Sequence, residues 1–306
     1  MNKQGTDALR SELQKNFDCA TKTATFYDNR KQLQAVILLG LSQPSRYGFE
    51  NVHCHMYFNK IDSDVKKWIK QILDDWSPFI DDKFTLTLDP SYQNLLPHLI
   101  DRGLCIQSLL LHGFPEKSLQ LLGFPPDKKQ IEKQFGVCIE PLSSVEQAEC
   151  LVEQRRRYFT THKQHDPITS QRKIDSDEQA QIDSFVLGKL LRSIETGLNT
   201  QYVIIQNNEI VGGFGLTIYD NHPCLGCCAG VDIAFEPSIQ GHGLGTTAYR
   251  ILLKRMIELN VQVFRGVTAN PAVIHLSRKM QKHLRGWVLV PGTCSEIPDH
   301  FMYAKD

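Results

Sequence analysis

The sequence predicts an α/β protein of two domains. Short apolar stretches of strand length alternate with longer stretches whose apolar residues recur at helical spacing. The 306 residues are enough to bury two separate cores. We expect a polar tail or helix at residues 1–32, a first domain at 33–112, a linker at 113–136 and a second domain at 137–306.

The first domain is predicted to alternate strands with helices. Its strands are the apolar stretches 34–41, 50–58, 83–88 and 104–111. Apolar residues three and four apart predict a helix over 62–76, and Asp89-Pro90 opens a second one. The stretch after this domain is rich in proline, glycine and lysine, which is typical of a linker.

The second domain follows the order strand, two helices, three strands, helix, strand, helix and two strands. Its helices are expected at 144–159, 181–195, 246–259 and from Asn270-Pro271 onward. Its strands are expected at 137–141, 202–206, 210–219, 227–235, 261–268, 287–290 and 301–304. Asn207-Asn208 suits a two-residue hairpin turn, and the polar stretch 160–178 is expected to be a loop.

Composition excludes several classes of protein. Lys+Arg and Asp+Glu both number 34, and neither half is strongly basic, so a general nucleic-acid binder is disfavoured. The longest apolar run, 35–41, is too short to cross a bilayer, and residues 1–22 do not resemble a secretory signal. Nine scattered cysteines suit free thiols in a reducing compartment, so we expect a cytoplasmic protein without membrane partners.

The most informative stretch is the glycine-rich loop from Phe235 to Thr246. Its glycines allow a tight turn between a strand and a helix, and they let the backbone approach a ligand closely. Amides at a helix start favour an anion, so the loop predicts a phosphate-binding site. Its Gly-x-Gly-x-Gly spacing and its late position argue against a dinucleotide fold, and no Walker lysine follows. Taken alone, three glycines indicate only a flexible turn.

The residues around the glycines resemble the acetyl-coenzyme A (acetyl-CoA) loop of the GNAT acetyltransferases. That family pattern is Val-x-Pro-x-x-Arg/Gln-Gly-x-Gly-x-Gly/Ala, and here Phe235, Pro237, Gln240 and three glycines occupy it. Asn270-Pro271 resembles the second family signature, and the final strand at 301–304 resembles the closing strand. The resemblance covers about residues 137–306. It implies the GNAT fold, a mixed and mostly antiparallel sheet flanked by helices.

The resemblance also implies how a cofactor binds. The loop amides hold the CoA pyrophosphate, and the preceding strand pairs with the pantetheine arm where the sheet splays. An amide near Phe235 then polarises the thioester carbonyl. Asn270 contacts the cofactor arm or only caps its helix. The cofactor-binding residues implied are Ile233, Ala234, Phe235, Gln240, Gly241, His242, Gly243, Leu244, Gly245, Thr246 and Asn270. No metal is expected.

Acid and base groups are less well defined. The acceptor amine must be neutral to attack the thioester, and Asp232, on the strand before the loop, is the candidate general base. The alternative is that Asp232 is only a polar residue on a solvated face of the sheet. The family's acid is a tyrosine seven residues after the signature asparagine, and here that position is Ser277. Counting back from Gly286-Trp287 gives Lys282 instead, so Ser277, water or another group serves, or the acid is absent.

The acceptor stays open. Arg155-Arg156-Arg157 suits an anionic acceptor, whereas the acidic run from Asp175 to Glu178 suits a cationic amine. Each run is equally typical of a solvated face. The cysteine-rich hairpin 222–228 has zinc-like spacing without a second ligand pair, so small packed residues are expected there.

The resemblance implies an acetyl-CoA-dependent N-acetyltransferase that acts on a small-molecule or protein amine. A non-catalytic CoA-binding sensor is the alternative, because the tyrosine is missing. An acyl donor other than acetyl-CoA or a hydroxyl acceptor would depend on pocket shape, and a toxin acting on transfer RNA is disfavoured by the neutral charge. Residues 33–112 share the strand–helix order but lack a glycine loop, which predicts a degenerate GNAT-like unit in tandem.

Overall fold

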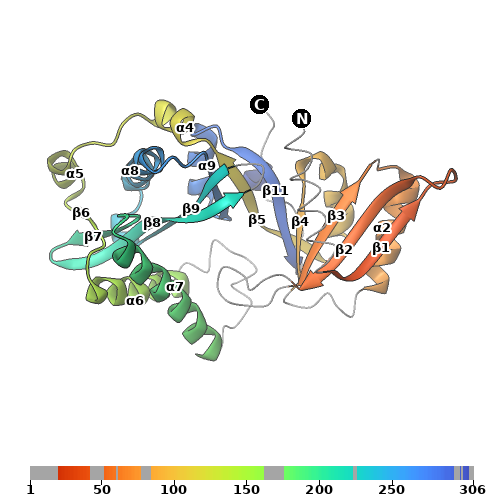
Figure 1. The fold of residues 1–306 in the computed structure, drawn as a ribbon, viewed down its shortest axis with the longest axis horizontal. Coiled ribbons are helices and arrows are strands. Elements are labelled where there is room, and N and C mark those ends of the chain that lie inside the picture. The colour runs from red at the N-terminus through yellow and green to blue at the C-terminus, as the bar shows by residue number, and fades with distance from the viewer. Residues whose placement is uncertain are drawn as a thin grey trace. The chain divides into compact units, whose positions relative to one another are not determined.

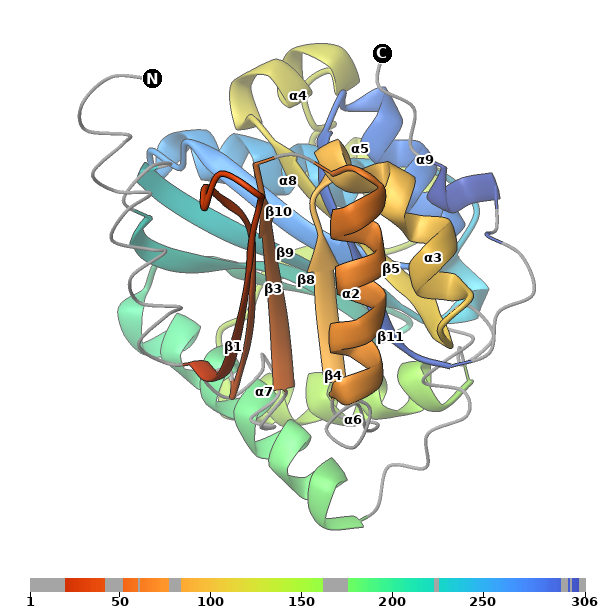
Figure 2. The same cartoon turned by 90° about the vertical axis from the view of Figure 1, so that its right-hand side faces the viewer.

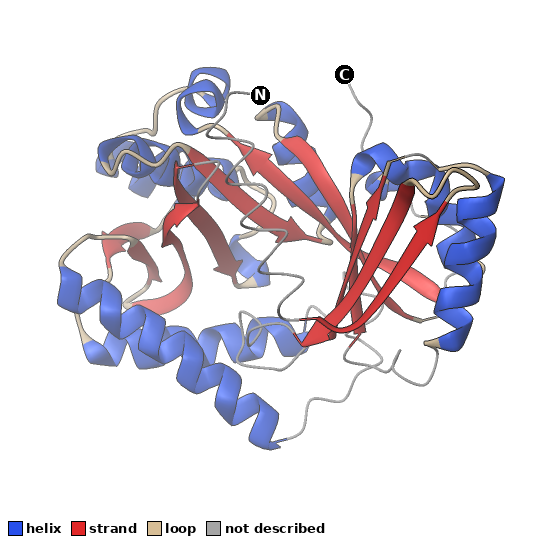
Figure 3. Cartoon of the chain, turned by 45° about the vertical axis from the view of Figure 1, so that its right-hand side comes forward, coloured by secondary structure: helices blue, strands red, loops and turns tan. Residues whose placement is uncertain are grey.

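The chain divides into two compact units, residues 1–110 with 284–306 and residues 111–283 (Figure 1). The computed structural model describes residues 20–41, 52–59, 61–76, 84–161, 176–222, 226–292, 297 and 299–302. We refer to the two parts as unit 1 and unit 2. Each unit contains neighbouring strands and helices, seen in red and blue in Figure 3.

Unit 1 contains six neighbouring strands. Its strand order is β1 (Ala20–Tyr27), β2 (Leu33–Leu41), β3 (Val52–Phe58), β4 (Phe84–Leu88), β11 (His283–Pro291) and β5 (Leu104–Gly113). The pairs β1–β2, β2–β3 and β4–β11 are antiparallel, whereas β3–β4 is parallel. The parallel pair is joined by helix α2 (Ser63–Asp75), which stands in front of the sheet in Figure 2.

Helix α2 forms where the apolar spacing predicts it. Asp62 caps its first turn by accepting hydrogen bonds from the Asp64 and Val65 amides. Its buried stripe is Val65, Ile69 and Leu73. The following connection contains the short helices η2 (Pro90–Leu95) and α3 (Leu96–Ile100).

Unit 2 contains the glycine loop. Its sheet order is β6 (Cys138–Pro141), β7 (Gln201–Gln206), β8 (Glu209–His222), β9 (Gly226–Phe235) and β10 (Val263–Thr268). Neighbours in this order are antiparallel except β9 and β10, which run parallel. Asn207 and Asn208 both have positive φ at the β7–β8 turn, as the hairpin prediction requires.

Helices cover both faces of the unit 2 sheet. On one face, α6 (Val145–Thr161) and α7 (Ser176–Thr196) form a core that includes Leu151, Leu190 and Val203. On the other face, α8 (Leu244–Glu258) packs with Phe214 and Phe264. Figure 1 shows α6 and α7 below the teal strands and α8 above them. The remaining helices are α4 (Pro115–Leu122), α5 (Lys128–Phe135) and α9 (Pro271–Lys279).

The compact units differ from the predicted domains. Residues expected in the polar tail form β1, whose alternating exposure shows one half-buried face. The expected linker folds into α4 and α5, because Leu119, Leu122 and Ile131 enter the core of unit 2. Residues 284–306 group with unit 1, since β11 pairs with β4.

The chain end also differs from the prediction. Phe301 belongs to a short 3₁₀ helix, Asp299–Phe301, instead of a closing strand. Its carbonyl accepts a hydrogen bond from Trp287 Nε1 at 3.1 Å, which fixes it as a turn against β11. Residues 303–304 of the predicted strand, and 162–175 of the predicted loop, lie outside the described residues.

Both units share one pairing pattern. Strands β1–β3 and β7–β9 are successive antiparallel neighbours, then a helix, α2 or α8, leads to a parallel strand, β4 or β10. The tandem relationship stays a prediction, and this pattern agrees with it. Among the described residues, no helix is long and apolar enough to cross a membrane.

Candidate functional site

The central feature of the site is a gap between two neighbouring strands of unit 2. Strand β10 pairs with β9 only from Val263 opposite Cys228 to Arg265 opposite Gly230. Beyond that point, no pair joins the two strands within the described residues. Strand β9 nevertheless continues to Phe235, and β10 to Thr268. The sheet therefore splays open along the second half of β9.

Hydrogen-bond directions show which backbone groups face the gap. The Gln262 amide donates to the Cys227 carbonyl on the β10 side, whereas the Glu236 amide donates to Val211 of β8. Backbone groups alternate in direction along a strand. The amides and carbonyls of Val231, Ile233 and Phe235 therefore point into the gap, and those of Asp232 and Ala234 point toward β8.

The gap leads to the glycine loop at the start of α8. Gly241 and Gly243 have φ of 86° and 89°, a conformation that side chains disfavour. A Cβ at either position would meet no atom within 4 Å, so conformation and not space requires glycine there. Gly243 is the N-cap of α8 and offers no side-chain cap. The first amides of the helix, at Leu244, Gly245 and Thr246, are thus left for another acceptor.

Residues Gly241, His242 and Gly243 are exposed, as an anion-binding loop requires. Gln240 helps to shape the turn, because its Nε2 donates to the Phe235 carbonyl at 2.8 Å. Asn270 caps α9, since its side-chain oxygen accepts from the Ala272 amide at 2.9 Å. The structure thus assigns Asn270 the capping contact.

The Asp232 side chain lies on the face of β9 that is covered by α6 and α7, opposite to the face covered by α8. Its Oδ2 is 2.5 Å from Nη1 of Arg155 and 3.5 Å from Nζ of Lys189. Both cations are largely buried, with side-chain exposures of 6% and 15%. Two cations favour the ionised form of this carboxylate. Asp232 is therefore part of a charge cluster and not a residue on a solvated face.

The same face carries two more polar side chains at the start of the gap. The Arg265 guanidinium carbon lies 4.6 Å from the centre of the Tyr219 ring. The Tyr219 hydroxyl lies over Gly230, where an added Cβ would be 2.9 Å from it. Buried Nε atoms of Arg155 and Arg265 have no hydrogen-bond partner in the described part of the chain. Arg155, Lys189 and Arg265 thus bring three basic side chains to the face of β9 that carries Asp232.

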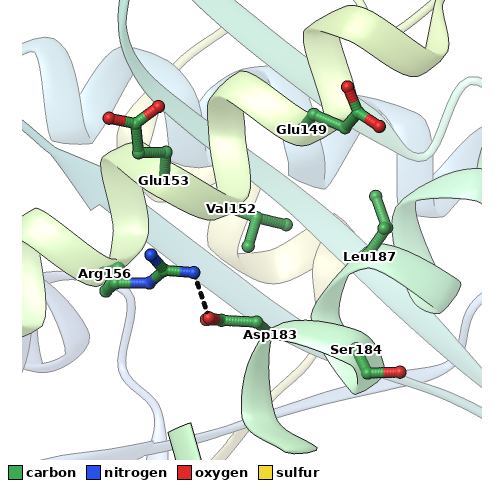
Figure 4. A pocket seen from close by; sticks show the side chains of 7 residues that line it. All are labelled: Glu149, Val152, Glu153, Arg156, Asp183, Ser184 and Leu187. Atoms are coloured by element: carbon green, nitrogen blue, oxygen red, sulfur yellow. Dashed lines mark hydrogen bonds and ion pairs between the residues drawn. The ribbon is translucent and has the colours of Figure 1, made fainter. Parts of the chain in front are cut away.

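The remaining arginines of the 155–157 run point elsewhere. Arg156 pairs with Asp183 of α7, and Nη2 of Arg157 is 3.8 Å from a Glu236 oxygen. Figure 4 shows the Arg156–Asp183 pair at the edge of a pocket of about 370 Å³ between α6 and α7. The pocket is lined by these two helices alone, by Glu149, Val152, Glu153, Arg156, Asp183, Ser184 and Leu187. It therefore lies apart from the strand gap.

Ser277 and Lys282 lie together on the α8 face. Ser277 is fully buried on α9, and its Oγ has no hydrogen-bond partner among the described residues. The Lys282 amide donates to the Ser277 carbonyl at 3.0 Å. Lys282 is 4% exposed, and burial lowers the pKa of its amine to about 7.

Sequence reasoning missed several members of this site. Arg265 is the single basic residue of β10, and Lys189 interrupts the apolar stretch 185–191 of α7, which was the available signal. Their convergence on β9 depends on how α7 and β10 pack, which spacing along the chain does not reveal. No group of three or more metal-ligating residues occurs in the described part, although the His222 side chain and Cys224 lie outside it.

Comparisons with known proteins agree with this geometry. The model of the Acetyltransferase (GNAT) family matches residues 158–281. A GCN5-related N-acetyltransferase structure from Sphaerobacter thermophilus has a TM-score of 0.54 at 12% identity, covering 92% of this chain and 86% of that chain. A GNAT-family acetyltransferase from Colwellia psychrerythraea has a TM-score of 0.51 at 10% identity, covering 92% and 95%. No curated protein sequence matches the chain.

Residues 158–281 therefore match the GNAT family model, and unit 2 has the GNAT fold. The family match and the splayed, mostly antiparallel sheet carry this conclusion. The GNAT fold predicted from the glycine loop is confirmed.

Proposed function

We propose that the chain is an N-acetyltransferase that moves an acetyl group from acetyl-CoA to an amine. The single observation that carries the proposal is the gap between β9 and β10, which ends at an uncapped helix start. Gap-facing backbone groups of β9 suit an extended amide chain, and the helix start suits a pyrophosphate. Acetyl-CoA has both parts, joined in that order.

In this proposal the cofactor residues keep the roles that the resemblance implies. The loop from Gly241 to Thr246 binds the pyrophosphate, with Gln240 holding the turn. Ile233 and Phe235 pair with the pantetheine arm, and Val231 extends this row. Ala234 and Asn270 act indirectly, because the first pairs with β8 and the second caps α9.

The reaction proposed is a direct attack by the acceptor nitrogen on the thioester carbon. A gap-facing amide near Phe235 stabilises the developing oxyanion. Asp232 is proposed to receive the proton of the acceptor amine through water. Its contacts with Arg155 and Lys189 keep it ionised, and thus able to accept, at the expense of basicity.

We further propose that the acceptor carries an anionic group. Three basic side chains, Arg155, Lys189 and Arg265, lie on the face of β9 that α6 and α7 cover. Basic side chains gathered on one face favour a negatively charged partner, and guanidinium groups bind carboxylates and phosphates with two hydrogen bonds.

The test is release of free CoA thiol from acetyl-CoA. We expect release to be faster with amines that carry a carboxylate or phosphate than with acetyl-CoA alone. Variant Asp232→Asn should bind acetyl-CoA but release thiol more slowly. Tight binding of acetyl-CoA without acceleration by any amine would instead favour a CoA-binding sensor.

A further inference from the structure

The buried amine of Lys282 lies where strands β9 and β10 separate. Its Nζ is 4.4 Å from the centre of the Phe264 ring and 4.9 Å from that of Tyr249. Phe264 belongs to the last paired stretch of β10, opposite Ala229. The amine is thus held between β10 and α8 at the start of the gap.

Gly266 brings the amine closer still to the open part of the gap. It is the first β10 residue beyond the paired stretch, and a Cβ built on it would lie 3.8 Å from the Lys282 Nζ. Any larger side chain at this position would occupy the space beside the amine. Because residue 266 is glycine, the Lys282 amine lies next to the β10 backbone that borders the gap.

The surroundings of Lys282 suit a group that gives and regains a proton. Burial disfavours the ammonium form and lowers its pKa to about 7. The two ring faces act in the opposite direction by stabilising the cation. Both protonation states are consequently accessible near neutral pH, which is where a general acid is most effective.

Ser277 is a poorer proton donor. A serine hydroxyl is far less acidic than an ammonium group, and the buried Ser277 Oγ has no hydrogen-bond partner among the described residues to assist it. The backbone bond between Lys282 and Ser277 places both residues in the turn that ends α9. Lys282 is thus the more acidic group in the region where the resemblance expects tyrosine.

We propose that Lys282 protonates the sulfur of coenzyme A as the acetyl group leaves. This inference rests on the proposed function. The acceptor nitrogen forms a bond with the carbonyl carbon, the carbon–sulfur bond breaks, and its electron pair goes to sulfur. Lys282 Nζ gives a proton to that sulfur, which yields free CoA thiol and leaves the Lys282 side chain as a neutral amine. The proton released by the acceptor passes to Asp232 and from there to solvent, and Lys282 is reprotonated from solvent.

The test follows the ionisation of the CoA thiol while CoA is bound, and it needs no acceptor. CoA labelled with carbon-13 at the thiol-bearing carbon is bound to the full chain, and its NMR shift is recorded against pH. An ammonium group and a thiolate stabilise each other, so the two groups titrate as a pair: the bound thiolate raises the pKa of the Lys282 amine above about 7, and the retained ammonium lowers the pKa of the thiol. We expect the thiol to ionise about one pH unit lower, a tenfold change in acidity, in the wild type than in Lys282→Met. Met replaces Lys with similar volume and no charge.

A second variant separates charge from proton donation. Lys282→Arg keeps a cation that does not lose its proton in proteins. It should keep the low ionisation midpoint of the bound thiol. Thiol release from acetyl-CoA should fall in it as in Lys282→Met, and thermal unfolding checks that both variants are folded.

The outcomes separate the two proposals. Equal ionisation midpoints in wild type and Lys282→Met, with CoA bound to both, would overturn the role of Lys282 alone. Equal thiol release in wild type and Lys282→Arg would also overturn it. Failure of the wild type to bind CoA would overturn the proposed function and this inference together.

Discussion

The Asp232 carboxylate of β9 is 2.5 Å from a guanidinium nitrogen of Arg155, which reaches it from α6. The two residues are separated by 77 positions in the chain. Lys189 of α7 contacts the same oxygen at 3.5 Å, so both covering helices are tied to the strand that borders the gap. This cluster places charged chemistry beside the proposed thioester position.

Removing the Asp232 charge should affect turnover and stability together. Asp232→Asn leaves Arg155 buried without its anion, and breaking a buried pair costs about 3 kcal/mol. We expect thiol release to fall about tenfold, as expected when a general base is lost, while the affinity for acetyl-CoA is unchanged. Calorimetry, an amine-dependent assay and urea unfolding measure the three quantities.

The control for this variant is Arg157→Gln, because Arg157 is 61% exposed and its carboxylate contact is long at 3.8 Å. It should change stability by less than about 0.5 kcal/mol. If Asp232→Asn releases thiol at the wild-type rate across the pH range, Asp232 is not the base.

The preference for an anionic acceptor should depend on Arg265. Matched acceptors are an amino acid and the amine that lacks its carboxylate. We expect the wild type to prefer the amino acid, because the Arg265 guanidinium can bind its carboxylate. Arg265→Met should reduce that preference by about tenfold, equivalent to about 1.4 kcal/mol. Equal rates for both acceptors in the wild type would contradict an anionic acceptor.

Lys282 should make stability depend on pH in a defined window. Its pKa is about 7 in the folded chain, against 10.5 for the unperturbed side chain. Between these values the unfolded chain binds more protons, so the free energy of unfolding rises with pH. The rise is up to about 1.4 kcal/mol per pH unit. Below pH 7 the full penalty of burying the charge is present.

Lys282→Met isolates this contribution. The difference in unfolding free energy between variant and wild type should favour the variant below pH 7 and shrink as the pH approaches 10. Urea unfolding at several pH values measures it. A difference that does not vary with pH would show that the Lys282 amine is not held in a setting that disfavours its charge.

Asn270 should contribute as a helix cap. Asn270→Ala removes the acceptor for the Ala272 amide and should lower stability by about 1 kcal/mol. Asn270→Asp keeps a good cap and should be close to wild type. A loss of acetyl-CoA affinity in both variants, without a loss of stability in the first, would favour cofactor contact over capping.

Local patterns predicted the parts of unit 2 that depend on neighbouring residues. The helix start at Asn270-Pro271 and the turn at Asn207-Asn208 follow from side-chain capping and positive φ, whereas α8 begins at Leu244, two residues before its predicted start. These features need no knowledge of distant packing. The resemblance predicted that the sheet splays beside the strand that precedes the glycine loop. The observed gap lies beside that strand, β9.

Features that depend on distant packing were not predictable in this way. The stretch 113–136 has the composition of a linker, yet Leu119, Leu122 and Ile131 fold it onto the core through α4 and α5. The assignment of β11 to unit 1 depends on its pairing with β4, about 200 residues earlier. Arg155 and Lys189 reach Asp232 only because two helices pack on one sheet face.

The most direct test of the account is calorimetric titration of acetyl-CoA into the wild type, Gly243→Asp and Gly243→Asn. Asp and Asn have nearly the same shape, and Asn tolerates the positive φ of this position. We expect Gly243→Asp to bind at least about tenfold more weakly than Gly243→Asn, because its charge repels the pyrophosphate. Equal affinities in the two variants, or no binding by the wild type, would contradict the assignment of this loop to acetyl-CoA.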